Sequence, residues 1–528
     1  MLFTEFTFLL FLIAVTAVYF ICPPKHRWIV LLVASIAFYA IAGVVFLPFA
    51  ILTAALSFYT AKLIHKENQN CEEMLKQLKG DKEAAKACRE KSKTKCRRYM
   101  VVALVLIFMY LAYTKFGRRA INWFSAAVGS DWLASVIPVI VPLGISYYSF
   151  SVVGYVLDVY WKRYSPEQNF FKYLLYVLYF PHILQGPIAR YNKLGVQFSQ
   201  EHRFDYKRVC FGAQLIMWGF FQKLVIADRL NLYVTQAFKL CRHRYGPALL
   251  LAAIFYACQL YADFAGCVNM SRGMSQIFGI ELEDNFRQPY FARSVDEFWR
   301  RWHITLGAWF KDYLYLPVSM SKGVKNASKT IKKRFGNTAG KNFITIVALA
   351  AVWLCTGVWH GTGWNYIIWG AWQFGLITLS LLLEPVYVKV KNVLRINDES
   401  NEWKAFQILR TFVLVGLIPR IIVRCASLSD AKTFFYNMIV QWGKMKWGKG
   451  VLLGLGLDAT NFAIAIIGIA IMITVSVLKE RGVSIRESIS RMHIVARWII
   501  YIAAFYSIVI FGIYGPGYDA SAFAYIGF

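Results

Sequence analysis

The sequence predicts an all-α polytopic membrane protein with roughly a dozen transmembrane helices. Hydrophobic residues make up 58% of the 528 residues and only 17% are charged, against about 25% in soluble domains. The apolar residues also gather into runs long enough to cross a bilayer, which takes about 20 residues of helix. A water-soluble protein cannot bury that much apolar surface, so the soluble fold classes are excluded.

The charge distribution favours a lipid surface as the partner. The formal net charge is +30, which in a soluble protein would suggest nucleic acid. Here the basic residues lie mainly in loops between apolar runs, where an excess of Lys and Arg marks cytoplasmic segments that face anionic lipid. No basic stripe carries interleaved polar residues of the kind that read bases. We therefore expect membrane lipids, and no nucleic acid, among the partners.

The N-terminal part predicts three spans. The apolar run 2–21 follows a start without Lys or Arg, so it lacks the basic region of a signal peptide and is expected to be retained. The basic segment 23–27 follows it, which predicts an extracytoplasmic N-terminus. Residues 28–60 are too long for one span, and we expect two helices with a break near Gly43 and Pro48.

Residues 65–98 form the first polar excursion, with eleven Lys/Arg and six Asp/Glu. Their residue types favour helix, so the sequence predicts a cytoplasmic charged helical loop. Cys71, Cys88 and Cys96 lie within it. A metal site is the less favoured interpretation, because neither a ligand spacing nor a paired histidine accompanies these thiols.

The rest of the chain alternates apolar runs with polar breaks. A second basic loop, 322–341, has seven Lys/Arg and no acid and is expected in the cytoplasm. Shorter polar breaks lie at 395–404 and 478–497. No internal repeat of fixed period is present, which counts against a solenoid and against an inverted-repeat transporter. Further spans are predicted near 100–114, 133–160, 170–188, 208–227, 246–270, 341–358, 364–388, 406–423, 450–477 and 496–514.

Residues 261–317 mix ionisable groups with aromatics at a density that a lipid-facing helix would not tolerate. Ser294 and Glu297 have the spacing of a capping box, which predicts a helix from Val295. This helix is either an amphipathic interfacial helix in which His303 is merely hydrogen-bonded, or the wall of a pocket. Helical spacing places on one side Phe298, Arg301, Trp302, Thr305 and Trp309.

The run 345–372 contains one histidine, His360, and no Lys, Arg, Asp or Glu. This histidine is either a structural residue that bonds a neighbouring helix or a base in a cavity of low dielectric constant. Burial disfavours the imidazolium and so favours a neutral ring that accepts a proton. Gly357, Gly361 and Gly363 surround it and allow backbone or substrate to approach closely.

Two prolines and a glycine interrupt the apolar segment 179–191. Non-helical backbone at membrane depth is tolerated only inside protein or beside a water-filled cavity. The segment is therefore either a kinked span or a cavity wall with Gln185 and Arg190 at its edge. His182 is expected to be structural.

These runs together carry a family resemblance. They are VPLGISYYSFSVVGYVLDVYW (141–161), YFPHILQGPIARY (179–191), YADFAG (261–266), the run 284–317 that contains RWH, and VWHGTGWNYIIWG (358–370). The set resembles the membrane-bound O-acyltransferases, and more narrowly the bacterial branch with alginate O-acetyltransferase and teichoic-acid D-alanyltransferase. Segments 424–438 and 523–528 are more similar to the alginate type. The resemblance covers most of the chain from Val141 to Phe528.

The resemblance implies transfer of an acyl group to a hydroxyl inside a helical bundle that encloses a central funnel or tunnel, with re-entrant or interfacial helices. It also implies that His360 of the WHG run is catalytic and that His303 of the RWH run is the second catalytic histidine. The residues expected to bind substrate are Trp302, Arg301, Asp312, Tyr313, Asn285, Gln185 and Trp359.

We expect a single integral-membrane domain over 1–528, with its catalytic core at 141–388. The C-terminal helices, 406–528, are expected to be of the alginate O-acetyltransferase-like type. The resemblance places the protein in a bacterial inner membrane. It also implies no permanently bound cofactor, and we find no spacing that suggests a metal site.

The leading hypothesis is O-acetylation of a cell-surface or exported polysaccharide. Acetyl-CoA on the cytoplasmic side would be the donor, and a histidine would act as general base. The resemblance implies an extracytoplasmic serine acetyltransferase-like partner or the polysaccharide itself as acceptor. One alternative is D-alanyl transfer to teichoic acid from the phosphopantetheine thioester of a carrier protein. An alternative of another class is a transporter or lipid-binding scaffold.

Overall fold

The computed structural model of the chain describes residues 3–78, 80–129, 132, 139–361, 363–444, 452–515 and 518. Within these residues the regular secondary structure is helical. The described residues form no sheet, and their β-pairing is limited to one isolated antiparallel bridge. The predicted all-α class is therefore confirmed. The chain divides into two compact units. Unit one is Met1–Gly212 with Met274–Glu283, and unit two is Ala213–Gly273 with Asp284–Phe528.

Unit one begins with the predicted N-terminal spans. The break expected in 28–60 is confirmed, because one helix ends at Gly43 and the next carries Pro48 in its first turn. Residues 133–138 of the span predicted at 133–160 lie outside the described residues, and the remainder contains a helix from Ile145. The helices of unit one are α1 (Phe6–Ile21), α2 (Arg27–Gly43), α3 (Leu47–Gln77), α4 (Lys82–Val128), α6 (Ile145–Tyr160), α7 (Phe170–Leu178), α8 (Phe180–Ile183) and α9 (Tyr191–Leu194).

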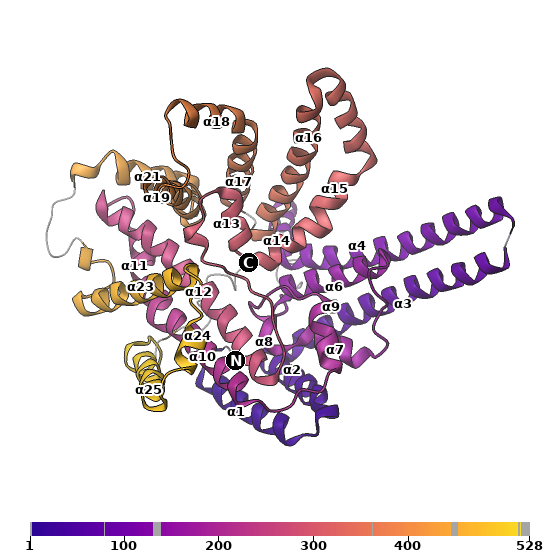
Figure 1. Cartoon of the computed structure of the whole chain (residues 1–528), viewed down its shortest axis with the longest axis horizontal. Coiled ribbons are helices and arrows are strands. Elements are labelled where there is room, and N and C mark those ends of the chain that lie inside the picture. Colours follow the sequence, from indigo (N-terminus) through magenta and orange to yellow (C-terminus); the bar gives the residue numbers. More distant parts are fainter. Residues whose placement is uncertain are drawn as a thin grey trace. The chain divides into compact units, whose positions relative to one another are not determined.

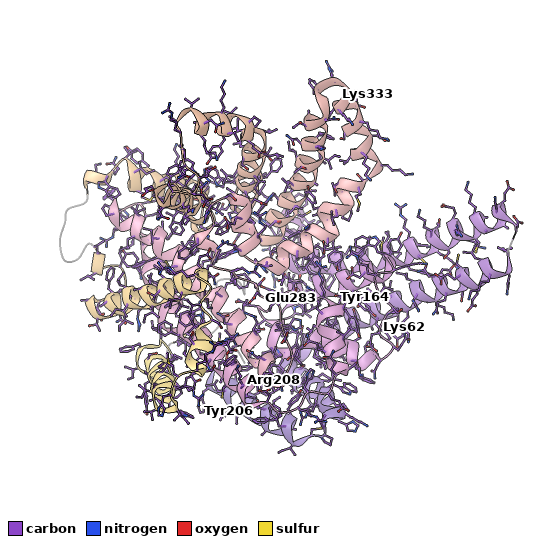
Figure 2. The ribbon with its side chains drawn as sticks, viewed as in Figure 1. Lys62, Tyr164, Tyr206, Arg208, Glu283 and Lys333 are labelled. Atoms are coloured by element: carbon purple, nitrogen blue, oxygen red, sulfur yellow. The ribbon has the colours of Figure 1, made fainter. Side chains whose placement is uncertain are left out.

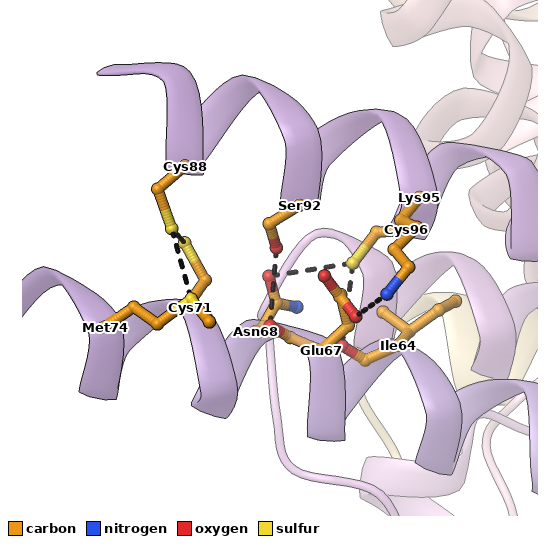
Figure 3. A network of polar contacts seen from close by, with 9 residues as sticks. All are labelled: Ile64, Glu67, Asn68, Cys71, Met74, Cys88, Ser92, Lys95 and Cys96. Carbon is orange, nitrogen blue, oxygen red and sulfur yellow. Dashed lines mark hydrogen bonds and ion pairs between the residues drawn. The ribbon is translucent and has the colours of Figure 1, made fainter. Parts of the chain in front are cut away.

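The charged loop 65–98 is the helical end of a long hairpin. Helices α3 and α4 continue beyond their apolar parts and lie side by side in antiparallel directions (Figure 1). The loop is thus helical as predicted. Lys95 pairs with Glu67 across the hairpin at 2.9 Å, and the Sγ atoms of Cys71 and Cys88 lie 3.5 Å apart as free thiols (Figure 3).

The interrupted segment 179–191 is not a continuous span. α7 ends at Leu178, the short α8 ends at Ile183, and the chain then turns without a helix until Tyr191. His182 is buried and its Nδ1 lies 2.9 Å from the carbonyl oxygen of Tyr179. Burial lowers the pKa of this imidazole, so the ring stays neutral in the structural position expected for it.

Unit two is built around α12, whose last turn belongs to unit one. The chain enters unit two in α10 and continues through a π-helical stretch, Phe221–Ala227, into α11. Its helices are α10 (Tyr206–Phe220), α11 (Asp228–Lys239), α12 (Pro247–Phe278), α13 (Val295–Arg301), α14 (Ile304–Phe310), α15 (Leu316–Met320), α16 (Lys322–His360), α17 (Trp364–Leu382), α18 (Glu384–Val393), α19 (Asn401–Thr411), α20 (Ile418–Arg424), α21 (Leu428–Ile439), α23 (Ala459–Glu480), α24 (Ile485–Ser490) and α25 (Ile494–Phe511).

The basic loop 322–341 is the first arm and tip of a helical hairpin. α16 changes direction at Gly336, whose φ of 89° is in the left-handed region that glycine adopts without strain. The two arms are antiparallel, and the Ser328 hydroxyl donates a hydrogen bond of 2.7 Å to the carbonyl oxygen of Gly340. Lys333 lies near the tip (Figure 2). The second arm carries the chain to His360 at its end.

Eight helical segments of the described residues are long and apolar enough to cross a membrane, or nine if the bent pair α17–α18 is one span. This count is lower than a dozen partly because Pro24–Gln77, which contains both α2 and α3, counts once. Helices α17 and α18 differ in direction by 60°, at the break before Pro385. The protein is therefore a multi-pass membrane protein.

A buried ionic group joins α12 to the π-helical stretch of unit two. The Lys223 ammonium lies 2.7 Å from Asp228 and 2.8 Å from Asp263, the aspartate of the YADFAG run. All three side chains are buried. Removing one partner from such a group would leave an uncompensated buried charge, at a cost of about 3–5 kcal/mol. The group therefore fixes the register of α12, which carries one wall of the site described next.

Candidate active site

His360 lines a small cavity of about 40 Å³ in unit two. The cavity has room for roughly three water-sized positions. Its walls come from α12, α13, α16, α17 and the segment around α20, and most of them are aromatic. The residues that line it are Tyr256, Leu260, Phe298, Trp299, Trp302, His360, Tyr366, Trp369, Val415, Arg420 and Val423.

The His360 ring is held between indoles. It is 8% exposed, and its centroid lies 4.5 Å from the Trp359 ring and 4.9 Å from the Trp369 ring, both edge to face. Aromatic side chains therefore form most of the surroundings of the ring. The side chain faces the small cavity, so it is placed to meet a substrate bound there.

Close packing of α16 against α17 fixes this position. A Cβ atom on Gly370 would lie 2.7 Å from the carbonyl oxygen of Trp353, and one on Gly357 would lie 2.9 Å from that of Tyr366. A Cβ atom on Gly361 would lie 2.2 Å from the Tyr366 ring. Only glycine permits these approaches. The glycines of the WHG region thus serve the packing of α17 and its tyrosine against the histidine.

A short extended segment before α13 shapes the RWH region. Phe286 and Trp302 form the antiparallel bridge, the Arg287 N–H donates to the Arg301 carbonyl oxygen at 2.9 Å, and the Ile304 N–H donates to that of Asn285 at 3.1 Å. The predicted helix does begin at Val295, and Ser294 caps it. These pairings end it at Arg301, so the prediction that one continuous helix carries residues 295–309 is wrong.

His303 stands at this break with φ of 48° and ψ of 52°, a left-handed conformation that costs a non-glycine residue about 1–2 kcal/mol. Its side chain is 4% exposed and packs edge to face on Phe264, with ring centroids 4.8 Å apart. Nδ1 lies 3.3 Å from the Asn285 Oδ1 atom, which also accepts bonds from the N–H and hydroxyl of Thr305. An acceptor there requires Nδ1 to carry the proton.

The other ring nitrogen of His303, Nε2, is buried and has no hydrogen-bond partner among the described residues. Desolvation lowers the pKa of this imidazole well below its ordinary 6.5, so the ring is neutral at physiological pH. Nε2 can then accept a hydrogen bond from a bound group. His303 is absent from the lining of the small cavity, while the neighbouring Trp302 belongs to it.

Trp302 carries a close cation contact in the small cavity. The Arg420 guanidinium carbon lies 4.4 Å from the Trp302 ring centroid, and the guanidinium also donates to the Tyr290 hydroxyl. Arg420 is buried, lines the cavity, and was missed by our sequence analysis. A signal was present, because an arginine inside the apolar run predicted at 406–423 marks a functional position by its cost in a membrane.

Comparison with known proteins identifies the family. Residues 162–332 match the model of the membrane-bound O-acyltransferase family (MBOAT). A probable alginate O-acetylase AlgI of Pseudomonas syringae pv. tomato is 30% identical over 461 residues, which cover 86% of this chain and 79% of that protein. A peptidoglycan O-acetyltransferase of Helicobacter pylori is 28% identical over 65% of this chain and 62% of its own. The chain belongs to the membrane-bound O-acyltransferase family.

The chain is also similar to a teichoic acid D-alanyltransferase of Bacillus subtilis, which is 29% identical over 49% of this chain and 63% of its own length. All these relatives are named as acyl-transferring enzymes. The resemblance to the membrane-bound O-acyltransferases predicted from the sequence is thus confirmed, and the protein is an acyltransferase. This finding decides against the transporter or scaffold alternative.

The other predicted substrate-binding residues of this acyltransferase are distributed over several places. Arg301 points away from the small cavity, since its guanidinium pairs with Glu297 at 2.6 Å and with Glu480 at 2.8 Å. Trp359 contacts His360 from the side of α16. Asp312 and Tyr313 lie in a π-helical stretch, Lys311–Tyr315, and the Tyr313 ring packs on Trp309.

Gln185 belongs to unit one, in the turn after α8. Its side chain is 2% exposed, and neither amide atom has a hydrogen-bond partner among the described residues. A buried amide of this kind suits a position beside water or a ligand. Its assignment to substrate binding stays a prediction, as do those of the residues in unit two.

Proposed function

We propose that this acyltransferase moves an acetyl group from acetyl-CoA, bound from the cytoplasmic side, to O-acetylate a cell-surface or exported polysaccharide. The observation that carries the proposal is the shared cavity. His360 from the WHG run and Trp302 from the RWH run line the same small, aromatic cavity, although 58 positions of sequence separate them. Such an arrangement suits a base that must stay neutral until it takes a proton.

In the proposed mechanism His360 is the general base. It removes the proton of the attacking hydroxyl as the hydroxyl oxygen forms a bond to the thioester carbonyl carbon. The carbonyl oxygen then carries negative charge, which the buried guanidinium of Arg420 would stabilise electrostatically. Collapse breaks the carbon–sulfur bond, and the imidazolium returns the proton to the leaving thiolate. General base catalysis of this kind contributes about 10²–10⁴-fold in rate.

His303 would position the acceptor. Its Nδ1–H is engaged by Asn285, and its buried Nε2 is available as an acceptor for a hydroxyl. A group that only accepts and stays neutral orients a substrate without taking its proton. This division gives the two histidines different roles, chemistry at His360 and alignment at His303.

The names of the relatives support the acetyl donor and the polysaccharide acceptor. Alginate O-acetylases align with 86% of this chain, while the teichoic acid D-alanyltransferase aligns with 49%. D-alanyl transfer from a carrier protein is therefore the second candidate. An extracytoplasmic partner with a nucleophilic serine would complete transfer to the polymer if the acetyl group leaves the membrane on that side.

The proposed location is a bacterial inner membrane with an extracytoplasmic N-terminus. The basic segment 23–27, the charged end of the α3–α4 hairpin and the basic tip of α16 would then all face the cytoplasm. The first three helices are consistent with this arrangement, because α1, α2 and α3 would cross in alternate directions from an outside start. Glycosylation or cysteine-labelling scans of these loops measure the orientation.

The experiment that tests the function is mass spectrometry of the extracellular polymer from cells with the intact gene and cells without it. We expect O-acetyl esters to disappear with the gene and to return with the wild-type chain. Loss of alanyl esters would support the second candidate. An unchanged ester content in both fractions would contradict acyl transfer to an exported polymer.

A further inference from the structure

Unit two contains a second, much larger cavity of about 730 Å³, a size typical of ligand sites. We call it the large cavity. Helices α10, α12, α23, α24 and α25 and the segment 284–288 form its walls. It adjoins the active site, because Tyr261 and Phe286 line it and Phe286 packs on Trp302 of the small cavity, with ring centroids 5.0 Å apart.

One end of the large cavity is strongly basic. Four basic side chains and one acidic side chain line it, which gives a net charge of +3; they are Arg272, Arg287, Lys479, Arg486 and Asp284. Asp284 pairs with Arg272 at 2.5 Å. Burial and then the nearby Arg272 charge lower the pKa of Arg486, while the charges of Asp284 and Glu487 raise it. Cations therefore outnumber anions among the residues that line this end. Such a cluster attracts an anion.

The other part of the large cavity is apolar and lies deeper along the same helices. On α23 the lining residues run from Lys479, next to the end of the helix, back to Val475 and Ile471. Eight residues of helix correspond to about 12 Å. On α25 the apolar lining continues to Ala504 and Ile508. The cavity is thus amphiphilic, with cations at one end and an apolar channel leading away from them.

The helices that enclose the channel are exposed to the membrane. Ile467 on α23 is 60% exposed and Ile499 on α25 is 61% exposed, and both helices are candidate spans. The basic end coincides with the end of α23 and the polar break at 478–497, which is where phospholipid headgroups lie. The apolar part of the cavity therefore lies along two helices that would border the hydrocarbon core.

We propose that the large cavity binds an anionic membrane phospholipid, with its phosphate among Arg272, Arg287, Lys479 and Arg486 and an acyl chain along Val475, Ile471 and Ala504. Basic pockets between membrane helices suit such headgroups. The apolar lining along α23 and α25 favours a lipid over a soluble thioester donor, whose hydrophilic nucleotide would make no apolar contacts there. The site is additional to the proposed acetyl transfer. It adjoins the active site through Phe286 and through Asn285, which lines the large cavity and holds His303.

The test is native mass spectrometry of the full-length protein purified in mild detergent and supplied with phosphatidylglycerol. The double variant Arg287→Gln/Lys479→Gln removes two exposed cations from the basic end. Each basic residue near an anionic lipid contributes about a factor of five in affinity, so we expect a loss of about twenty-five-fold. Ala504→Phe blocks the channel and leaves the cations in place, and we expect it to reduce retention as well. Lys432→Gln, an exposed lysine of α21, is the matched control.

A parallel thermal-shift series adds phosphatidylglycerol, phosphatidylcholine or coenzyme A to the same proteins. Stabilisation by phosphatidylglycerol alone, lost in the double variant and kept in the control, supports the proposal. It is overturned if the double variant retains as much phosphatidylglycerol as wild type, or if phosphatidylcholine is held equally well. Stabilisation by coenzyme A that depends on Arg287 and Lys479 would assign the cavity to the thioester donor instead.

Discussion

The small and the large cavity of unit two share an aromatic wall but differ in volume, charge and lining. The small cavity is about 40 Å³ and lined by rings, with Arg420 as its cation. The large cavity is about 730 Å³, with four basic side chains at one end and an apolar channel at the other. A small space lined by aromatic rings suits proton transfer, whereas a basic end with an apolar interior suits an amphiphile.

The largest expected effect is at His360. His360→Ala removes the base from the small cavity, so we expect kcat for acetyl transfer to fall by about 10³-fold while the KM of the donor changes little. Turnover of the thioester in membranes, at equal protein level, measures it. His243→Ala removes an exposed histidine of the same unit and should match wild type. Equal activity of the two variants would contradict the assignment of His360 as the base and of the small cavity as the catalytic site.

The shared wall is the next target. Trp302 separates the large cavity from the small one through its contact with Phe286, and it also supports Arg420. Trp302→Ala should lower kcat about 10²-fold, because water enters the site and the guanidinium loses its support. Trp302→Phe keeps a ring and should lose less than tenfold. Turnover per folded molecule is compared between the two variants. Equal losses in both would show that an aromatic ring at position 302 does not support activity.

His303 should show a smaller and different loss. His303→Asn keeps a residue that tolerates the left-handed conformation but removes Nε2, so the KM for the acceptor should rise about tenfold with a lesser change in kcat. Steady-state kinetics at varied acceptor concentration give the two constants. His303→Gly serves as the control for backbone strain. A fall in kcat as large as that of His360→Ala would instead place His303 in the chemical step.

The smallest effect on turnover is expected in the large cavity. Arg287→Gln/Lys479→Gln lies outside the small cavity, so kcat in detergent with saturating donor should stay within about twofold of wild type. Acetyl-CoA turnover measures this directly. A loss of tenfold or more would connect the basic end to the donor and merge the two cavities into one functional site.

Local signals in the sequence predicted much of this architecture. The break at Gly43 and Pro48, the charged helical hairpin at 65–98 and the start of α13 at Val295 all depend on residues close together in the chain. Helix breakers, charge runs and capping boxes act within a few residues. For that reason these three features could be predicted from the sequence alone.

The break at Trp302 and His303 could not be predicted in the same way. It depends on backbone pairing with Phe286 and on the Asn285 side chain, which lie some sixteen to eighteen positions earlier and show no strand pattern. The shared cavity of His360 and Trp302 likewise depends on tertiary packing of α16 on α17 through Gly357 and Gly370. Arg420 could have been predicted from the sequence, because an arginine inside an apolar run is costly in a membrane and therefore indicates a functional position.

The central claim is that the uncharged imidazole of His360 takes the proton of the attacking hydroxyl. The pH dependence of kcat in wild type and in His360→Gln tests it most directly. We expect wild-type kcat to fall tenfold per pH unit on the acid side, as His360 becomes protonated, and the residual activity of His360→Gln to show no such fall. An identical acid limb in the variant, with activity within tenfold of wild type, would contradict the claim.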